Sequence, residues 1–209
     1  GNQKKMKRKL KVFAVLFVGL LAAMTGCGSQ GDPVAKITTV KGAVSTKLAG
    51  AADFATAAAE QMLRSGDAIK TGDDADADLE IISDKSQIRL SSNTFLEIKN
   101  FTEKELRQIS GIAIYNVTPQ DRKLKIQTPQ GMATVLGTVL RIDASETETV
   151  VSVEKGKVGF SKKAGHEVII ESGMKYSTSF TEDAAQPIDP FELEKTFHGD
   201  DLKPVINPR

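Results

Sequence analysis

The sequence predicts an all-β fold, an antiparallel jelly-roll-like sandwich or closed β-roll with one or two short helices. From Val34 onward, apolar residues recur at every second position, which is the period of a strand with one buried face. Turn-forming residues interrupt this pattern about every 8 to 12 residues, as in antiparallel sheets. Aromatic residues make up 5% of the chain and tryptophan is absent. We therefore expect a core of aliphatic side chains.

The chain of 209 residues is long enough for one ordinary domain, or at most two small ones. Changes in composition divide it into four parts. These are a signal peptide at 1–26, a lipidated cysteine and short linker at 27–33, a β domain at 34–180, and a proline-rich tail at 181–209.

The first part has the organisation of a secretory signal. A basic run at 4–11 precedes an apolar run at 12–23, and small residues follow. Twelve residues of helix span about 18 Å, well short of the roughly 30 Å hydrocarbon core of a bilayer. The run therefore predicts export rather than a membrane-spanning helix.

Cys27 is the only cysteine, and it follows Thr25 and Gly26 at the end of the apolar run. This arrangement resembles a bacterial lipobox, although Met24 stands where leucine or valine is usual. The resemblance implies a lipid anchor on Cys27, and several acyl chains hold a protein stably on a membrane. Gly28, and not aspartate, follows the cysteine, and by resemblance to the lipoproteins of bacteria with two membranes this implies the periplasmic side of the outer membrane or the cell surface. The alternative is an ordinary exported protein cleaved after the small residues.

Period-two segments continue through the whole β domain. We expect strands at 77–81, 87–90, 95–99, 112–117, 123–128, 139–143, 149–153, 157–160 and 168–170. Two segments instead favour helices. Residues 53–64 are alanine-rich with Asp53 as a cap, and residues 102–109 open with Thr102 and Glu105 in capping-box spacing.

The charge distribution argues against nucleic-acid binding. Six of the 28 Lys and Arg residues lie in the first 26 residues, so the rest of the chain carries 22 cations against 27 acids. A body with about five net negative charges lacks the basic surface that binds phosphates.

Patterns that support catalysis are absent from the sequence. His166 and His198 are far apart and neither lies in a metal-binding motif. There is no nucleophile elbow, phosphate loop or dinucleotide fingerprint. We expect no catalytic residues, no metal and no cofactor.

One acidic run resembles part of a calcium loop. Asp74, Asp76 and Asp78 have the 1, 3, 5 spacing of such a loop, but Leu79 and Lys85 occupy its glycine and glutamate positions. Sequence alone leaves cation binding at 73–78 open against a solvated polar face.

The tail carries a second candidate feature. Phe191, Leu193 and Phe197 form either a short partner-binding motif or a strap that packs on the sandwich.

Short motifs of glycine, threonine and alternating apolar residues run through the β domain in a fixed order. They are Val40-x-Gly42-x-Val44, Leu63-x-x-Gly66-Asp67-x-Ile69-x-Thr71-Gly72, Ala77-x-Leu79, Ile88-x-Leu90, Leu96-x-Ile98, Thr128-Pro129-x-Gly131, Leu136-Gly137-Thr138-x-Leu140-x-Ile142 and Val151-x-Val153-x-x-Gly156-x-Val158. Their glycine and threonine residues suit a scaffold role, and we expect Thr71 and Thr138 to tie turn backbones through their hydroxyls. In order and spacing these motifs resemble the FecR domain of bacterial envelope proteins over residues 34 to about 179, although Leu140 stands where that family often has phenylalanine.

The resemblance implies an envelope protein that acts by contact. Our leading hypothesis is a non-enzymatic, lipid-anchored protein whose FecR-like domain binds a protein or polysaccharide of the cell envelope. The alternative is a periplasmic signalling component of a sigma/anti-sigma system, because well-known FecR domains belong to anti-sigma regulators. A glycan hydrolase is a third, weaker hypothesis.

Overall fold

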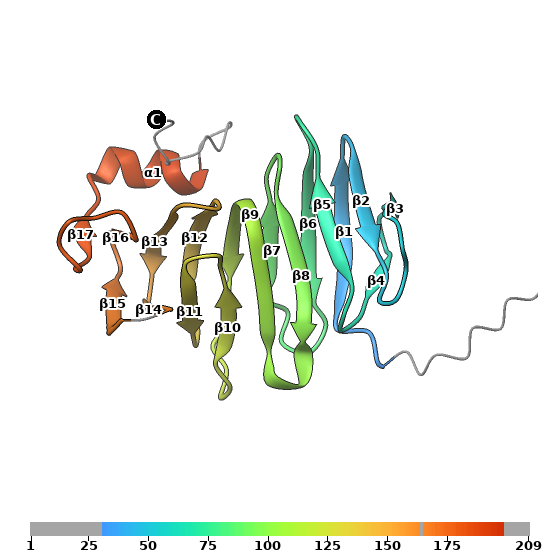
Figure 1. Ribbon diagram of the computed structural model, residues 1–209, viewed down its shortest axis with the longest axis horizontal. Helices are drawn as coiled ribbons and strands as arrows, with labels where there is room; N and C mark the ends of the chain where they lie inside the picture. The colour runs from blue at the N-terminus through green and yellow to red at the C-terminus, as the bar shows by residue number, and fades with distance from the viewer. Residues whose placement is uncertain (1–30, 164, 199–209) are drawn as a thin grey trace, which may run out of the picture.

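A computed structural model describes residues 31–163 and 165–198. Nearly all regular structure in this part of the chain is β-strand (Figure 1). The strands are β1 (Ala35–Lys41), β2 (Val44–Lys47), β3 (Ala55–Thr56), β4 (Met62–Leu63), β5 (Ala68–Thr71), β6 (Asp76–Ile81), β7 (Gln87–Leu90), β8 (Phe95–Asn100), β9 (Glu105–Asn116), β10 (Leu124–Gln127), β11 (Gly131–Val135), β12 (Val139–Ala144), β13 (Thr149–Lys155), β14 (Lys157–Lys162), β15 (Glu167–Glu171), β16 (Met174–Ser177) and β17 (Gln186–Pro187). A 3-10 turn, η1 (Phe101–Glu103), and one α-helix, α1 (Pro190–His198), complete the described elements.

The strands form two layers, here named sheet A and sheet B. Sheet A has the order β4-β1-β6-β7-β9-β12-β13-β16-β17. Sheet B has the order β3-β2-β5-β8-β9-β10-β11-β14-β15. Every pairing is antiparallel except that of β9 with β10. The all-β prediction is confirmed, whereas the sheets end in edge strands and do not close into a barrel; the jelly-roll likeness stays a prediction.

Strand β9 belongs to both sheets. Its first half pairs in sheet B and its second half in sheet A, and the change occurs at Gly111. The φ of Gly111 is +85°, and a Cβ at this position would lie 2.4 Å from the Cα of Thr94. The Thr94 hydroxyl donates to the Ile112 carbonyl and accepts from the Ile112 amide, both at 2.9 Å. Only glycine fits this crossing without strain.

The core between the sheets is aliphatic, as the composition predicts. Alternate residues of both sheets form one buried cluster. A small polar network lies within it, where the Tyr115 hydroxyl donates to the Gln108 side-chain oxygen at 3.0 Å. The Gln108 amide in turn donates to the carbonyls of Gly111 and Ile142. Burial raises the pKa of Tyr115, so this hydroxyl stays a neutral donor.

Both predicted helices are wrong. Residues 53–64 contain the short strands β3 and β4, which pair with β2 and β1, and Leu63 is fully buried. Residues 102–109 contain only the end of η1, after which β9 begins and buries Leu106 and Gln108 on one face. Strand pairing with β2 and β1 at the first place, and alternate burial in β9 at the second, therefore override weak helical propensity.

Candidate functional site

A groove of about 350 Å³ crosses the outer face of sheet A beside the C-terminal end of α1. Its lining combines an apolar floor with charged walls. The lining residues are Thr38, Asp78, Leu79, Glu80, Gln87, Ile88, Arg89, Ile114, Asn116, Val139, Glu154, Phe197 and His198.

Strand register places the floor of this groove. Ile114 of β9 lies opposite Arg89 of β7 on one side and Arg141 of β12 on the other. The three side chains therefore form one row across the outer face of the sheet. The groove lies over the Arg89 side of this row, and α1 lies over the Arg141 side.

Helix α1 forms the wall at the Arg141 side. Arg141 Nη1 donates to the carbonyl of Thr196 at 3.0 Å, and this carbonyl end of the helix attracts a cation. Lys175 of β16 pairs with Glu192 at 2.6 Å, and Phe197 is buried against the sheet. A nine-residue helix is marginal alone, so these contacts hold it in place.

The opposite wall is charged and open to solvent. Arg89 Nε pairs with Asp78 Oδ1 at 3.1 Å, and 59% of the Arg89 side chain is exposed. On the α1 side of the groove, His198 Nε2 lies 2.5 Å from Glu154 Oε1 at the C-terminal end of the helix. The groove thus offers an apolar strip between separated charges, which suits a protein segment better than a small anion or metal ion.

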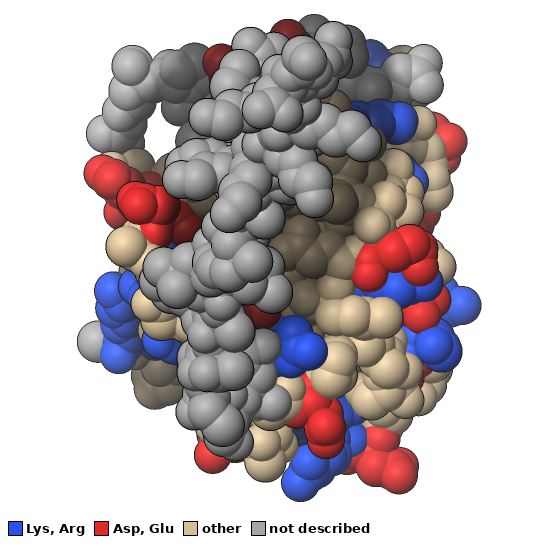
Figure 2. All heavy atoms as spheres, turned by 90° about the vertical axis from the view of Figure 1, so that its right-hand side faces the viewer, with Lys and Arg blue, Asp and Glu red and all other residues tan. Residues whose placement is uncertain are grey.

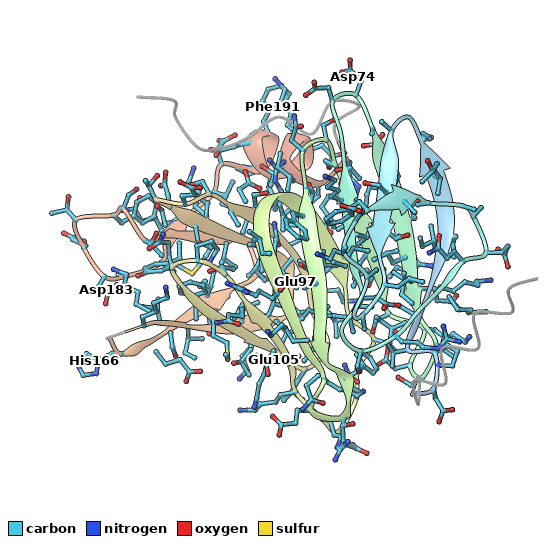
Figure 3. All side chains as sticks on the ribbon, turned by 45° about the vertical axis from the view of Figure 1, so that its right-hand side comes forward. Asp74, Glu97, Glu105, His166, Asp183 and Phe191 are labelled. Atoms are coloured by element: carbon cyan, nitrogen blue, oxygen red, sulfur yellow. The ribbon has the colours of Figure 1, made fainter. Side chains whose placement is uncertain are left out.

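The residues singled out from sequence as chemistry-bearing do not converge. Asp74 lies in the β5–β6 loop and His166 in the β14–β15 turn, far apart in Figure 3. Within residues 31–163 and 165–198, no group of three His, Cys, Asp or Glu side chains is arranged to hold a metal ion. Cys27, the expected lipid-attachment residue, lies outside the described residues.

The acidic run is spread over a loop and a strand. Asp73 accepts from Asn93 Nδ2 at 2.9 Å, and Asp78 is engaged by Arg89. Asp76 and Asp78 share the outward face of β6, whereas Asp74 lies in the preceding turn with φ +49°. The arrangement matches a solvated polar face rather than a calcium loop.

The threonines of the FecR-like motifs have the scaffold role expected of them. Thr71 Oγ1 donates to the Ser91 carbonyl and accepts from the Thr94 amide, and Thr138 Oγ1 donates to the Lys157 carbonyl at 3.0 Å. At the motif positions Gly131, Gly137 and Gly156, a Cβ would approach other atoms within 3.0 Å.

Asp67 is a motif residue whose role the sequence did not reveal. Its side chain is 3% exposed, and its two carboxylate oxygens accept from the amides of Ala49 and Arg64 at 2.7 and 2.8 Å. Asp67 thus links the β2–β3 loop to the β4–β5 turn, and its role is structural.

A second hollow, of about 550 Å³, lies among motif turns. Leu136 is 43% exposed there, beside Gly137, Thr138 and Gly156. Its other lining residues are Pro119, Lys157, Glu171 and Ser172.

The end of the molecule formed by β1 to β4 has mixed charge. Figure 2 shows acidic and basic side chains interleaved on the visible part of this face. Among the described helices, none is long and apolar enough to span a membrane.

The three apolar side chains that the sequence singled out in the tail are buried to different degrees. Phe197 is 5% exposed and Leu193 is partly buried, whereas Phe191 is 68% exposed and has the Lys195 ammonium 4.4 Å from its ring centre. Residues 186–198 therefore form a strap that is held on the sandwich through Phe197. Within this strap, β17 adds a short pairing with β16.

Sequence reasoning missed the groove, because its lining comes from six strands and α1. One signal was available. Residues 112–115 are apolar at every position, although a strand with one solvated face alternates. Ile114 lies on the outer face, so this run indicated a covered or binding surface there.

Comparison with known proteins confirms the resemblance. Residues 67–159 match the family model described as FecR protein, a region from the turn before β5 into β14. A search of curated proteins finds no match.

Two solved crystal structures share the fold. Both are of a proposed anti-sigma factor from Parabacteroides distasonis, each 18% identical to this chain, with TM-scores of 0.52 and 0.54. The similarity covers 62% and 63% of this chain and 62% and 64% of the solved chains. This chain thus matches less than two thirds of their length.

Proposed function

We propose that this chain is a non-enzymatic signalling component of the cell envelope that acts by binding a protein partner through its FecR-like domain. The match of residues 67–159 to the FecR family carries the proposal. That region contains β6, β7, β9 and β12, whose residues form most of the groove beside α1. The fold shared with a proposed anti-sigma factor supports signalling over a passive scaffold.

The location belongs to the same proposal. The lipobox-like sequence at Cys27 would tether the domain to a membrane outside the cytoplasm. The domain would then meet its partner in the envelope.

A binding mode through sheet A follows from the geometry of the groove. Ile114, Val139 and Phe197 provide an apolar strip for a partner side chain. Arg89 donates from Nε to Asp78 and, among the described residues, makes no hydrogen bond from its two terminal amino groups. Those groups can bind carbonyl or carboxylate oxygens of the partner.

Transcription in the host cell tests this function. We expect deletion of the gene to change transcript levels from a defined set of promoters, and the wild-type gene to restore them. Arg89→Glu, which reverses charge in the groove, should fail to restore them. Lys99→Glu makes the same reversal at an exposed site in β8 of sheet B and should restore them.

Unchanged transcription on deletion would overturn the proposal. Equal restoration by both variants would overturn the binding mode through the groove and would leave the signalling role in place. If the protein is not an enzyme, as proposed, the purified chain should produce no clearing in a zymogram of peptidoglycan or envelope polysaccharide.

A further inference from the structure

Among the residues that the structure describes, β15 (Glu167–Glu171) is the longest edge strand of the sandwich. In the described part of the chain, β3, β4 and β17 are edge strands of two residues each, whereas β15 has five. It pairs with β14 on one side, and no backbone hydrogen bond joins its other side to any described residue. Short edge strands resist pairing with other chains, so β15 is the edge that can accept one.

The outward side chains of β15 form a regular pattern. Glu167, Ile169 and Glu171 alternate with the more buried Val168 and Ile170, so they lie in one row on the outer face of sheet B. Ile169 is 50% exposed at the centre of this row. An edge that is only protected from pairing would carry a charge at its centre, whereas this one presents an apolar side chain between two acids.

This pattern disfavours pairing with a second copy. Antiparallel pairing of two β15 strands about Ile169 would place Glu167 of each copy opposite Glu171 of the other. Like charges directly opposite each other destabilise a strand pair. A shift of two residues would leave only three residues of each strand paired.

We infer that β15 is a strand-addition site for an extended protein segment with basic, apolar and basic residues at alternate positions. Such a segment continues sheet B, and its backbone hydrogen bonds supply affinity. Its two cations lie opposite Glu167 and Glu171, and its apolar side chain lies beside Ile169, which supplies specificity. This surface is on sheet B and does not depend on the groove in sheet A.

Charge variants of the full chain in detergent test the inference through oligomeric state. In Glu167→Lys, each lysine would face Glu171 of a second copy, so this single variant should dimerise. Glu171→Lys should do the same, because the pairing is reciprocal. The double variant E167K/E171K places lysine opposite lysine and should stay monomeric like the wild type. Native mass spectrometry gives the masses, and hydrogen exchange should show residues 167–171 protected only in the dimers.

Peptide binding provides the second arm. The probes are nine-residue peptides with Lys-Thr-Val-Thr-Lys or Glu-Thr-Val-Thr-Glu at their centres. The wild type should bind the lysine peptide about tenfold more tightly, since two cross-strand charge pairs change sign. The double variant should reverse this preference.

The inference is overturned if both single variants remain monomeric, or if the double variant keeps the wild-type peptide preference. Dimers without protection at 167–171 would place the contact elsewhere and would also overturn it. None of these results bears on the transcription test, so the two proposals fail separately.

Discussion

Arg141 and Asp143 form an ion pair with two contacts on the outer face of sheet A, beneath α1. Nε lies 2.6 Å from Oδ1 and Nη2 lies 2.9 Å from Oδ2. Both side chains are 2% exposed. Arg89 and Asp78 form the comparable pair across Ile114, but largely in solvent. One face of one sheet thus carries a covered and an uncovered Arg–Asp pair.

Removing the arginine should have very different effects in the two pairs. Arg141→Met removes the cation from a buried ion pair and should lower the free energy of unfolding by about 3–5 kcal/mol. Arg89→Met removes a solvent-exposed pair and should cost at most about 1 kcal/mol. Urea denaturation followed by circular dichroism measures both. Equal losses would contradict the position of α1 over Arg141.

The two phenylalanines of α1 provide a matched comparison of packing. Phe197→Ala removes a buried ring and should destabilise the chain by about 2–4 kcal/mol. Phe191→Ala removes an exposed ring and should change stability by no more than about 0.5 kcal/mol. Thermal unfolding of the two variants decides the point, and similar melting temperatures would mean that α1 does not dock through Phe197.

The crossing of β9 between sheets depends on Gly111. Gly111 and Gly50 have similar φ values, +85° and +80°, but only Gly111 has atoms near its missing Cβ. Gly50→Ala should cost about 1 kcal/mol from backbone strain alone. Gly111→Ala adds the collision with Thr94 and should cost at least about 3 kcal/mol. A Gly111→Ala variant as stable as Gly50→Ala would contradict this crossing.

The ion pair of Asp84 with Lys104, at 2.9 Å, predicts a pH-dependent contribution to stability. Burial raises the pKa of Asp84, but hydrogen bonds from Ser86 and Lys104 and the charge of Lys104 outweigh it, so the pKa is below its ordinary value of 3.8. A depressed pKa means that the contribution is present above 3.8 and is lost as the pH falls through the folded-state pKa.

Asp84→Asn should therefore be less stable than the wild type at pH 7, and the difference should shrink in acid. Lys104→Met removes the same pair from the other side and should show the same trend. A difference between wild type and Asp84→Asn that stays constant down to pH 2 would exclude the pair as its source.

The lipid anchor is testable in cells. A palmitate analogue should label the wild-type chain, whereas the Cys27→Ser variant should remain unlabelled, because Cys27 is the only thiol in the chain. Equal labelling of the two proteins would refute attachment at Cys27.

Sequence periodicity predicted the strands well where one face of the strand is buried and the other is exposed to solvent. Residues 77–81, 87–90 and 95–99 lie within β6, β7 and β8, because their alternation matches the burial in the sheet. It failed at 102–109, where a capping-box pattern precedes a strand. The burial of Leu106 and Gln108 depends on partners distant in sequence, which a local pattern does not contain.

The groove beside α1 could not be predicted for the same reason. Thr38 and His198 both line it, and they meet only because α1 docks on β12 and β13 through Arg141 and Glu154. The helix itself lies where Phe191, Leu193 and Phe197 predicted either a strap or a partner-binding motif. The sequence did not show which face of the helix packs on the sheet, because one of its phenylalanines, Phe197, is buried and the other, Phe191, is exposed.

Because β9 belongs to both sheets, the two layers cannot be separated without breaking this strand. A nick or deletion within Glu105–Asn116 would remove an inner strand from both sheets at once, so neither half could persist as a smaller folded remnant. Shuffling or duplication of this module in evolution would therefore have to keep β9 intact together with the partner strands on both of its halves.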